Sequence, residues 1–240
     1  MHPRTNTLVA ILTAAGTAGL GCSSNTSPDP AAYNPQIPST WLATVTHRYF
    51  PLPRGTTYQF SGQTPKGPET VTIDVLPATR AIMGVAATEV RDRVYLNGEL
   101  IEDTHDWYAQ DGAGNVWYLG EAAKDYDAGV LISTAGSWEW GVDGALPGII
   151  MWSNPAAHVG EEYRQEYYAN QAEDWAKVIA VGQAVTVPYG SFSDCVTIED
   201  WVGLHLEQPR EHKAYCPQVG QVNGVKLGTT EHVELISRTP

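Results

Sequence analysis

Runs of alternating apolar and polar residues recur along the chain, separated by Gly, Pro, Asn and Asp. Alternation with a period of two is typical of a strand that buries one face, and the longer period of an amphipathic helix is scarce here. This pattern predicts strands at 57–61, 70–75, 85–96, 99–110, 116–121, 130–133, 136–141, 162–168, 174–181, 183–187, 194–199, 213–215 and 231–237.

Turn residues between these runs predict hairpins. Asn97-Gly98 is a two-residue hairpin signal, the Gly-rich segment 111–115 closes a second hairpin, and Asn223-Gly224 predicts a third. About a dozen strands in one domain must curl, close or split into two layers to protect their edges. We therefore expect an all-β fold, a large curved antiparallel sheet forming a half-barrel or barrel. Residues 142–159 contain several turn dipeptides and predict a long loop crossing one end of the sheet.

The first residues have the layout of a targeting segment. Arg4 precedes a short apolar run that is too short to span a bilayer, and small residues lead to Cys22. Gly19-Leu20-Gly21-Cys22 resembles a lipobox, although Gly19 stands where Leu is usual, so ordinary signal-peptidase cleavage remains the alternative. We expect a signal peptide at 1–21, a lipidated Cys22 with a flexible tether over 22–40, and a single β domain over 41–240.

This organisation predicts an outer-membrane lipoprotein that faces the periplasm, joined to the membrane through its lipid anchor. A soluble secreted or periplasmic protein is the alternative. If Cys22 carries lipid, Cys195 and Cys216 remain as an even pair, which in an oxidising compartment favours a disulfide bond over two separate thiols.

The net charge of −13 narrows the list of partners. Nucleic-acid binding depends on basic patches, so a nucleic-acid partner is excluded. Eight Trp and twelve Tyr accompany only three Phe. These amphipathic aromatic residues suit half-buried strand positions, and they also suit ligand grooves. The candidates for ligand binding are Trp107, Tyr108, Trp117, Tyr118, Trp138, Trp140 and Tyr167.

Carboxylates accompany these aromatic residues on the predicted strands. Strand alternation places Asp106 and Tyr108 on one face, and it places Trp117 and Glu121 together on the next strand. If such faces converge inside a half-barrel, mutual repulsion would raise the pKa of the carboxylates or require a cation such as Ca²⁺. The alternative is that the carboxylates face water or pair with Arg91, Arg93, Arg164 and Lys177. The candidate metal ligands are Asp106, Glu121, Glu139, Asp143, Glu166, Glu173 and Asp174.

Three segments carry a family resemblance. DWYAQDGAGNVWYLGE (106–121), GSWEWGVDGALPGII (136–150) and EEYRQEYYANQAEDWAKV (161–178) resemble, in order and spacing, a family of uncharacterised bacterial secreted proteins and lipoproteins. The closing segments VTVPYGSFSDCVTIED (185–200) and EHKAYCPQVGQV (211–222) resemble the end of curved-sheet periplasmic lipoprotein carriers. The first resemblance implies a secreted or lipid-anchored protein and brings no activity with it.

We expect a cell-envelope binding protein that holds an amphipathic small molecule, a lipid or a glycan in an aromatic-lined β concavity. We expect no catalysis, because no nucleophile motif and no histidine metal motif appears in the sequence. A calcium-stabilised structural envelope protein is the first alternative. A hydrolase or isomerase that uses paired carboxylates is the second.

Overall fold

The computed structural model describes residues 33–240, and these residues form an almost purely β structure. The strands of the larger sheet and its attached hairpins are β3 (Thr57–Thr64), β4 (Gly67–Ile82), β5 (Val85–Leu96), β6 (Glu99–Gln110), β7 (Val116–Ala122), β8 (Asp125–Asp127), β9 (Val130–Ser133), β10 (Trp138–Glu139), β11 (Leu146–Met151), β12 (Glu162–Arg164), β13 (Glu166–Tyr167), β14 (Asp174–Val187), β15 (Gly190–Val202), β16 (Glu211–Cys216), β17 (Gly220–Lys226) and β18 (His232–Thr239). Strands β1 (Thr46–His47) and β2 (Phe50–Pro51) pair separately, and Pro155–His158 is a short 3₁₀ helix, η2.

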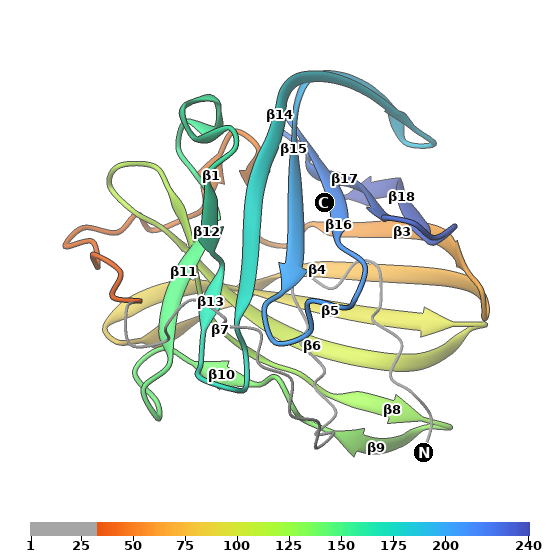
Figure 1. Ribbon diagram of the computed structural model, residues 1–240, viewed down its shortest axis with the longest axis horizontal. Helices are drawn as coiled ribbons and strands as arrows, with labels where there is room; N and C mark the ends of the chain where they lie inside the picture. The colour runs from red at the N-terminus through yellow and green to blue at the C-terminus, as the bar shows by residue number, and fades with distance from the viewer. Residues whose placement is uncertain (1–32) are drawn as a thin grey trace.

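The antiparallel sheet curls until its two ends meet. Its strand order runs β12-β14-β15-β16-β17-β18-β3-β4-β5-β6-β7-β11-β13, and β12 and β13 are consecutive pieces of chain separated only by Gln165. Figure 1 shows β14, β15 and β16 crossing in front of β4, β5 and β6, which run nearly at right angles behind them. The expected all-β curved sheet is therefore confirmed as a nearly closed barrel.

The seam of the barrel is the place where β12 and β13 part. Strand β12 pairs with β14, for example Arg164 opposite Trp175, whereas β13 pairs with β11, with Glu166 opposite Pro147. The Gln165 N–H donates to the Asp174 carbonyl at 2.9 Å, so the chain changes partners within one residue. Chain continuity, rather than a ladder of hydrogen bonds, closes the barrel here.

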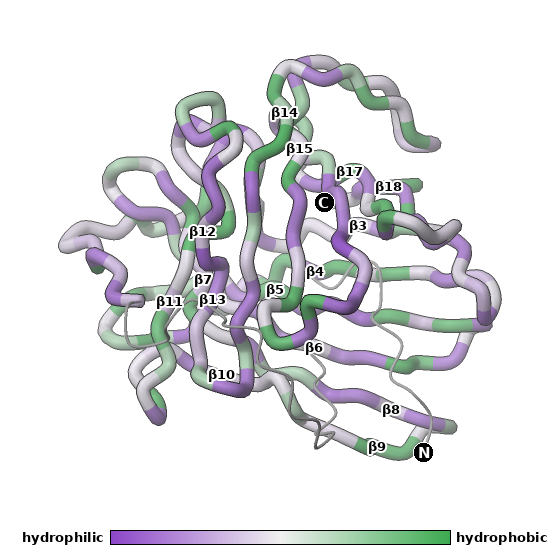
Figure 2. The backbone as a smooth tube through the Cα atoms, viewed as in Figure 1, coloured by the Kyte–Doolittle hydropathy of each residue, from purple (hydrophilic) through white to green (hydrophobic). Residues whose placement is uncertain are grey.

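The barrel interior has an apolar part that follows from strand alternation. Leu235, Phe60, Val71 and Val94 lie opposite one another on β18, β3, β4 and β5, and all four are buried. Figure 2 shows hydrophobic and hydrophilic stretches alternating along these strands. On β6, however, the residue opposite Val94 is Glu102, so the line of apolar residues ends at β5 and a carboxyl group follows it on β6.

Two of the three predicted hairpins are correct. Asn97 and Gly98 both have positive φ (53° and 84°), as the turn between β5 and β6 requires. At the second turn the Asp111 carboxylate accepts the N–H groups of Ala113 and Asn115, each at 2.9 Å, so it is occupied by its own loop. The third prediction is wrong, because Asn223-Gly224 lies inside β17.

Residues 142–159, expected to be a loop, are only partly irregular. They include β11, which pairs with β7 through Ile149 opposite Trp117, as well as η2. Asp143-Gly144 and Asn154-Pro155 flank β11, whereas Pro147-Gly148 lies within the strand. The expected disulfide is present: Cys195 on β15 is bonded to Cys216 on β16, across a sequence separation of 21.

The expected targeting segment and Cys22 lie outside the described residues. Part of the expected tether is described, and it contacts the domain. The Tyr33 hydroxyl donates to the Pro147 carbonyl at 2.8 Å, and the Thr40 carbonyl accepts the Gly112 N–H at 3.0 Å. Residues 33–41 therefore lie against strands β7 and β11 and the turn that precedes β7.

Candidate functional site

Six acidic side chains form a row around part of the barrel interior. We call this set the acidic row: Asp106 on β6, Glu121 on β7, Glu166 on β13, Asp174 on β14, Asp200 on β15 and Glu211 on β16. Asp106 lies opposite Glu121, and Asp200 lies opposite Glu211. The strands that carry them follow one another around the sheet, with β11 between β7 and β13 and β12 between β13 and β14 at the seam. Neighbouring strands lie about 4.8 Å apart, so the row brings many carboxyl groups close together.

Aromatic groups supply the hydrogen bonds at one end of the row. The Tyr118 hydroxyl lies 2.5 Å from Asp106 Oδ1 and 3.2 Å from Glu121 Oε2. A phenol has one proton, so it donates to one of these carboxyl groups at a time. Trp138 Nε1 donates to Glu166 Oε2 at 2.6 Å. The Tyr108 ring stacks on Tyr118 with 4.9 Å between centroids.

At the other end of the row a lysine balances part of the charge. Lys213 Nζ lies 2.6 Å from Asp200 Oδ2 and 3.4 Å from Glu211 Oε2. The Lys213 side chain is only 4% exposed, so this is a buried ion pair. Its ammonium group also faces Asp174 closely enough to oppose the rise in that carboxyl's pKa.

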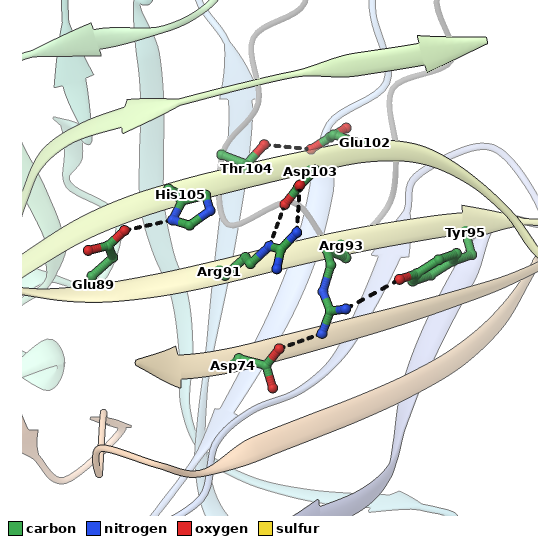
Figure 3. Close-up of polar contacts among 9 residues, drawn as sticks. All are labelled: Asp74, Glu89, Arg91, Arg93, Tyr95, Glu102, Asp103, Thr104 and His105. Carbon is green, nitrogen blue, oxygen red and sulfur yellow. Dashed lines mark hydrogen bonds and ion pairs between the residues drawn. The ribbon is translucent and has the colours of Figure 1, made fainter. Parts of the chain in front are cut away.

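The cations expected to neutralise these carboxylates pair elsewhere. Arg91 binds Asp103 at 2.7 Å and Arg93 binds Asp74, so both arginines serve a ladder across β4, β5 and β6 (Figure 3). That ladder also holds the His105 ring against Glu89 at 2.6 Å. The other two expected cations also pair with carboxylates outside the row: Arg164 binds Glu173 at 3.1 Å, and Lys177 binds Glu162 at 2.8 Å.

Burial therefore dominates the electrostatics of the row. Loss of solvation raises the pKa of Asp106, Glu121 and Glu166 well above the usual range, and each is raised further by negative neighbours. The pKa of Asp174 rises to about 8, first through burial and then through the charge of Asp200. Burial and mutual repulsion therefore both favour the protonated form of these carboxyl groups.

The structure brings together four of the seven candidate metal ligands, Asp106, Glu121, Glu166 and Asp174. The other three lie elsewhere. Glu139 pairs with Arg80, Glu173 pairs with Arg164, and Asp143 is exposed in a turn with φ of 50°. Within residues 33–240 no group of three or more His, Cys, Asp or Glu side chains is placed to hold a metal ion.

The seven aromatic candidates divide among three environments. Tyr108, Tyr118 and Trp138 are buried beside the acidic row. Trp107 is covered by Arg80, whose Cζ lies 4.2 Å from its ring centroid. The remaining candidates, which surround the N-terminal segment, are Trp117 and Trp140, both in contact with Trp41, and Tyr167, in contact with Tyr33.

A pocket of about 690 Å³ lies where the N-terminal segment crosses the seam. We call it the seam pocket. Of the seven aromatic candidates only Trp117 lines it, and four other aromatic side chains complete its walls: Tyr33, Trp152, Tyr163 and Trp175. Pro35 and Pro38 of the N-terminal segment and Ile149 of β11 add apolar surface, and Arg164 adds a charged group.

Arg164 is the least expected member of the seam pocket. Its side chain is 3% exposed, and its guanidinium lies over the Trp175 ring at 4.3 Å and near the Tyr167 ring at 5.0 Å. Sequence reasoning missed Tyr33, Trp152, Tyr163 and Trp175 as pocket residues because they converge only when the barrel closes. The alternation of apolar residues with Asp200 at the end of β15 is a signal that could have placed that residue in the acidic row.

Comparison with known proteins adds a distant structural likeness. No protein-family model and no curated protein matches the chain. A Bacteroides fragilis NCTC 9343 protein, whose crystal structure is described as having a YmcC-like fold, aligns with a TM-score of 0.41 and 13% identity. The alignment covers 81% of this chain and 100% of that chain. Among residues 33–240, no helix has the length and apolar character needed to span a bilayer.

Proposed function

We propose that this chain is an exported cell-envelope protein that binds an amphipathic small molecule, a lipid or a glycan in the seam pocket, without catalysis. The observation that carries the proposal is the pocket itself. Its volume of about 690 Å³ is in the range of small-molecule sites, and five aromatic side chains with one arginine line it. Flat apolar rings and a few convergent polar groups suit ligands with both apolar and polar faces.

The cellular location rests on two features. The sequence begins with a secretory layout that ends at Cys22, and the domain contains the Cys195–Cys216 disulfide. Disulfides persist in the periplasm and outside the cell and are rare in the cytosol. Lipidation of Cys22, and with it attachment to the outer membrane, belongs to the same proposal.

The pocket can be tested by filling it. Ser39 is exposed and lines the pocket, so Ser39→Trp should occupy its volume without disturbing the core. With 1-anilinonaphthalene-8-sulfonate as the probe, an aromatic anion, we expect the variant to bind at least tenfold more weakly than the unmodified chain. Fluorescence titration measures the affinity.

Gln183→Trp is the matched control, because Gln183 is exposed on β14 outside the pocket. Its affinity should equal that of the unmodified chain. Equal binding by all three proteins would place the probe elsewhere and refute the pocket as the binding site. Native mass spectrometry of the protein purified gently from the cell envelope then tests for a co-purifying lipid or glycan.

A further inference from the structure

The acidic row contains more hydrogen-bond acceptors than the described chain satisfies. Each of the six row members has one carboxyl oxygen that is buried and has no hydrogen-bond partner within residues 33–240. These oxygens are Asp106 Oδ2, Glu121 Oε1, Glu166 Oε1, Asp174 Oδ1, Asp200 Oδ1 and Glu211 Oε1. A buried polar atom left without a partner costs about 1–3 kcal/mol, so six of them in one row are expensive for a purely structural core.

A second observation points into the same region. The Tyr108 hydroxyl is fully buried and also has no hydrogen-bond partner in the described part of the chain. Tyr108 stacks on Tyr118, whose hydroxyl bonds to Asp106, and the charges of Asp106 and Glu121 act directly on Tyr108. This phenol oxygen therefore lies beside the carboxylates as a further polar group that a ligand could contact.

Two nearby cations act on this region without pairing with it: Arg164 opposes the rise in the pKa of Glu166 and Asp174, and Lys213 opposes that of Asp174. None of the ion pairs among residues 33–240 includes Asp106, Glu121, Glu166 or Asp174. Arg91, Arg93 and Arg164 pair instead with Asp103, Asp74 and Glu173, in that order. The chemistry that fits the row is therefore positive charge together with several N–H donors.

We propose that the acidic row binds an aliphatic polyamine, a chain of methylene groups that carries two or more ammonium groups. Each ammonium offers N–H donors to the open carboxyl oxygens, and a row spread over successive strands matches charges spread along a chain. The rings of Tyr108, Tyr118 and Trp138 supply apolar surface for the methylenes and cation–π contact for the ammonium groups. A single metal ion fits less well, because no three acidic side chains of the described residues are placed to hold one.

The proposal can be tested with spermine as the probe, using the full chain in amine-free buffer at moderate salt. Isothermal titration calorimetry should show saturable binding, and the melting temperature should rise with spermine concentration. Glu166→Gln keeps the shape of the side chain and an oxygen to accept from Trp138, but it removes a charge. We expect this variant to bind spermine at least tenfold more weakly while it remains folded.

Glu139→Gln is the matched control, because Glu139 pairs with Arg80 at the surface. Spermine affinity should be unchanged in this variant. Equal loss of spermine affinity in both variants, or binding that disappears at 150 mM salt, would mean only surface attraction to an acidic protein and would overturn the proposal.

Saturable binding of Ca²⁺ but not of spermine would overturn the polyamine proposal in favour of a metal ion. This site is separate from the seam pocket, so a negative result here leaves the proposed function untouched.

Discussion

The residues that set this protein apart are its buried carboxyl groups. A buried carboxyl group is stable in its neutral form, so Asp174 and its neighbours favour protonation in the folded state. Among residues 33–240, Lys213 is the one cation in ion-pair contact with the row, and its Nζ lies 2.6 Å from Asp200 Oδ2. The chain thus accepts a large electrostatic cost at a few positions, which is characteristic of sites that bind something.

This cost predicts an unusual pH dependence of stability. The pKa of Asp174 is raised from 3.8 to about 8 in the folded state, so its contribution is fully present below pH 4 and is lost as the pH rises towards 8. Without added amines, the melting temperature should fall between pH 5 and pH 8.5. Asp174→Asn should flatten this fall, as measured by thermal unfolding across the pH range.

The control for this measurement is Glu207→Gln, because the Glu207 side chain is 75% exposed. The slope of its melting temperature against pH should match that of the unmodified chain. A melting temperature of the unmodified chain that rises steadily from pH 5 to pH 8.5 would contradict the assignment of raised pKa values to the row.

Sequence reasoning placed four members of the row and missed two. Alternation along β6 and β7 puts Asp106 and Glu121 on faces that the hairpin then brings together, which is local information. Pairing of β14, β15 and β16 brings Asp200 close to Asp174 and Glu211, but these three reach Glu166 and Glu121 only because the two ends of the sheet meet at the seam. No pattern within a single strand reports that closure.

Among the elements, the long hairpins were predicted well and the short strands poorly. The bounds of β5 and β6 match the prediction, because strict alternation and an Asn-Gly turn agree. Strand β11 was taken for loop because Pro147-Gly148 lies within it. Strand β17 was not predicted, because Asn223-Gly224 within it was taken for a turn. The turn instead precedes this strand, with positive φ at Gln218 and Gly220.

Gly148 on β11 shows why a glycine is needed at the seam. A Cβ atom at this position would collide with the backbone of Arg164 and Gln165, where the chain passes from β12 to β13. We expect Gly148→Ala to destabilise the fold by about 1–3 kcal/mol, the usual cost of overpacking. Chemical denaturation measures the change.

Gly190→Ala serves as the comparison, since its Cβ would make only an ordinary contact, 3.5 Å from the Phe192 ring. It should be nearly neutral. If Gly148→Ala proved equally neutral, the close approach of β11 to the seam would be refuted.

A further element-scale prediction concerns the Cys195–Cys216 bond, which joins β15 to β16 beside the Val196 and Tyr215 pair. Replacing both cysteines with serine should lower the free energy of unfolding by about 2–4 kcal/mol. Denaturation of the variant and of the oxidised parent tests this. A difference of less than 1 kcal/mol would show that the bond adds little to the fold.

At the scale of the whole molecule, the barrel, the seam pocket and the N-terminal segment form one unit. We expect Cys22→Ala to release the protein from the membrane fraction into the soluble periplasmic fraction, because the variant would lack the proposed lipid anchor. Cell fractionation and immunoblotting measure the distribution. Unchanged membrane attachment would refute lipidation at this residue.

The contacts of residues 33–41 also have a mechanical meaning. The same stretch of chain that leads back towards the expected anchor forms one wall of the seam pocket, held by the Tyr33 bond to Pro147 and the Thr40 bond to Gly112. Tension transmitted to residue 33 from the N-terminal side acts on the Tyr33 bond to Pro147 before it reaches any strand of the barrel. Force on the N-terminal segment is therefore force on one wall of the seam pocket. A ligand bound against this wall would oppose that force.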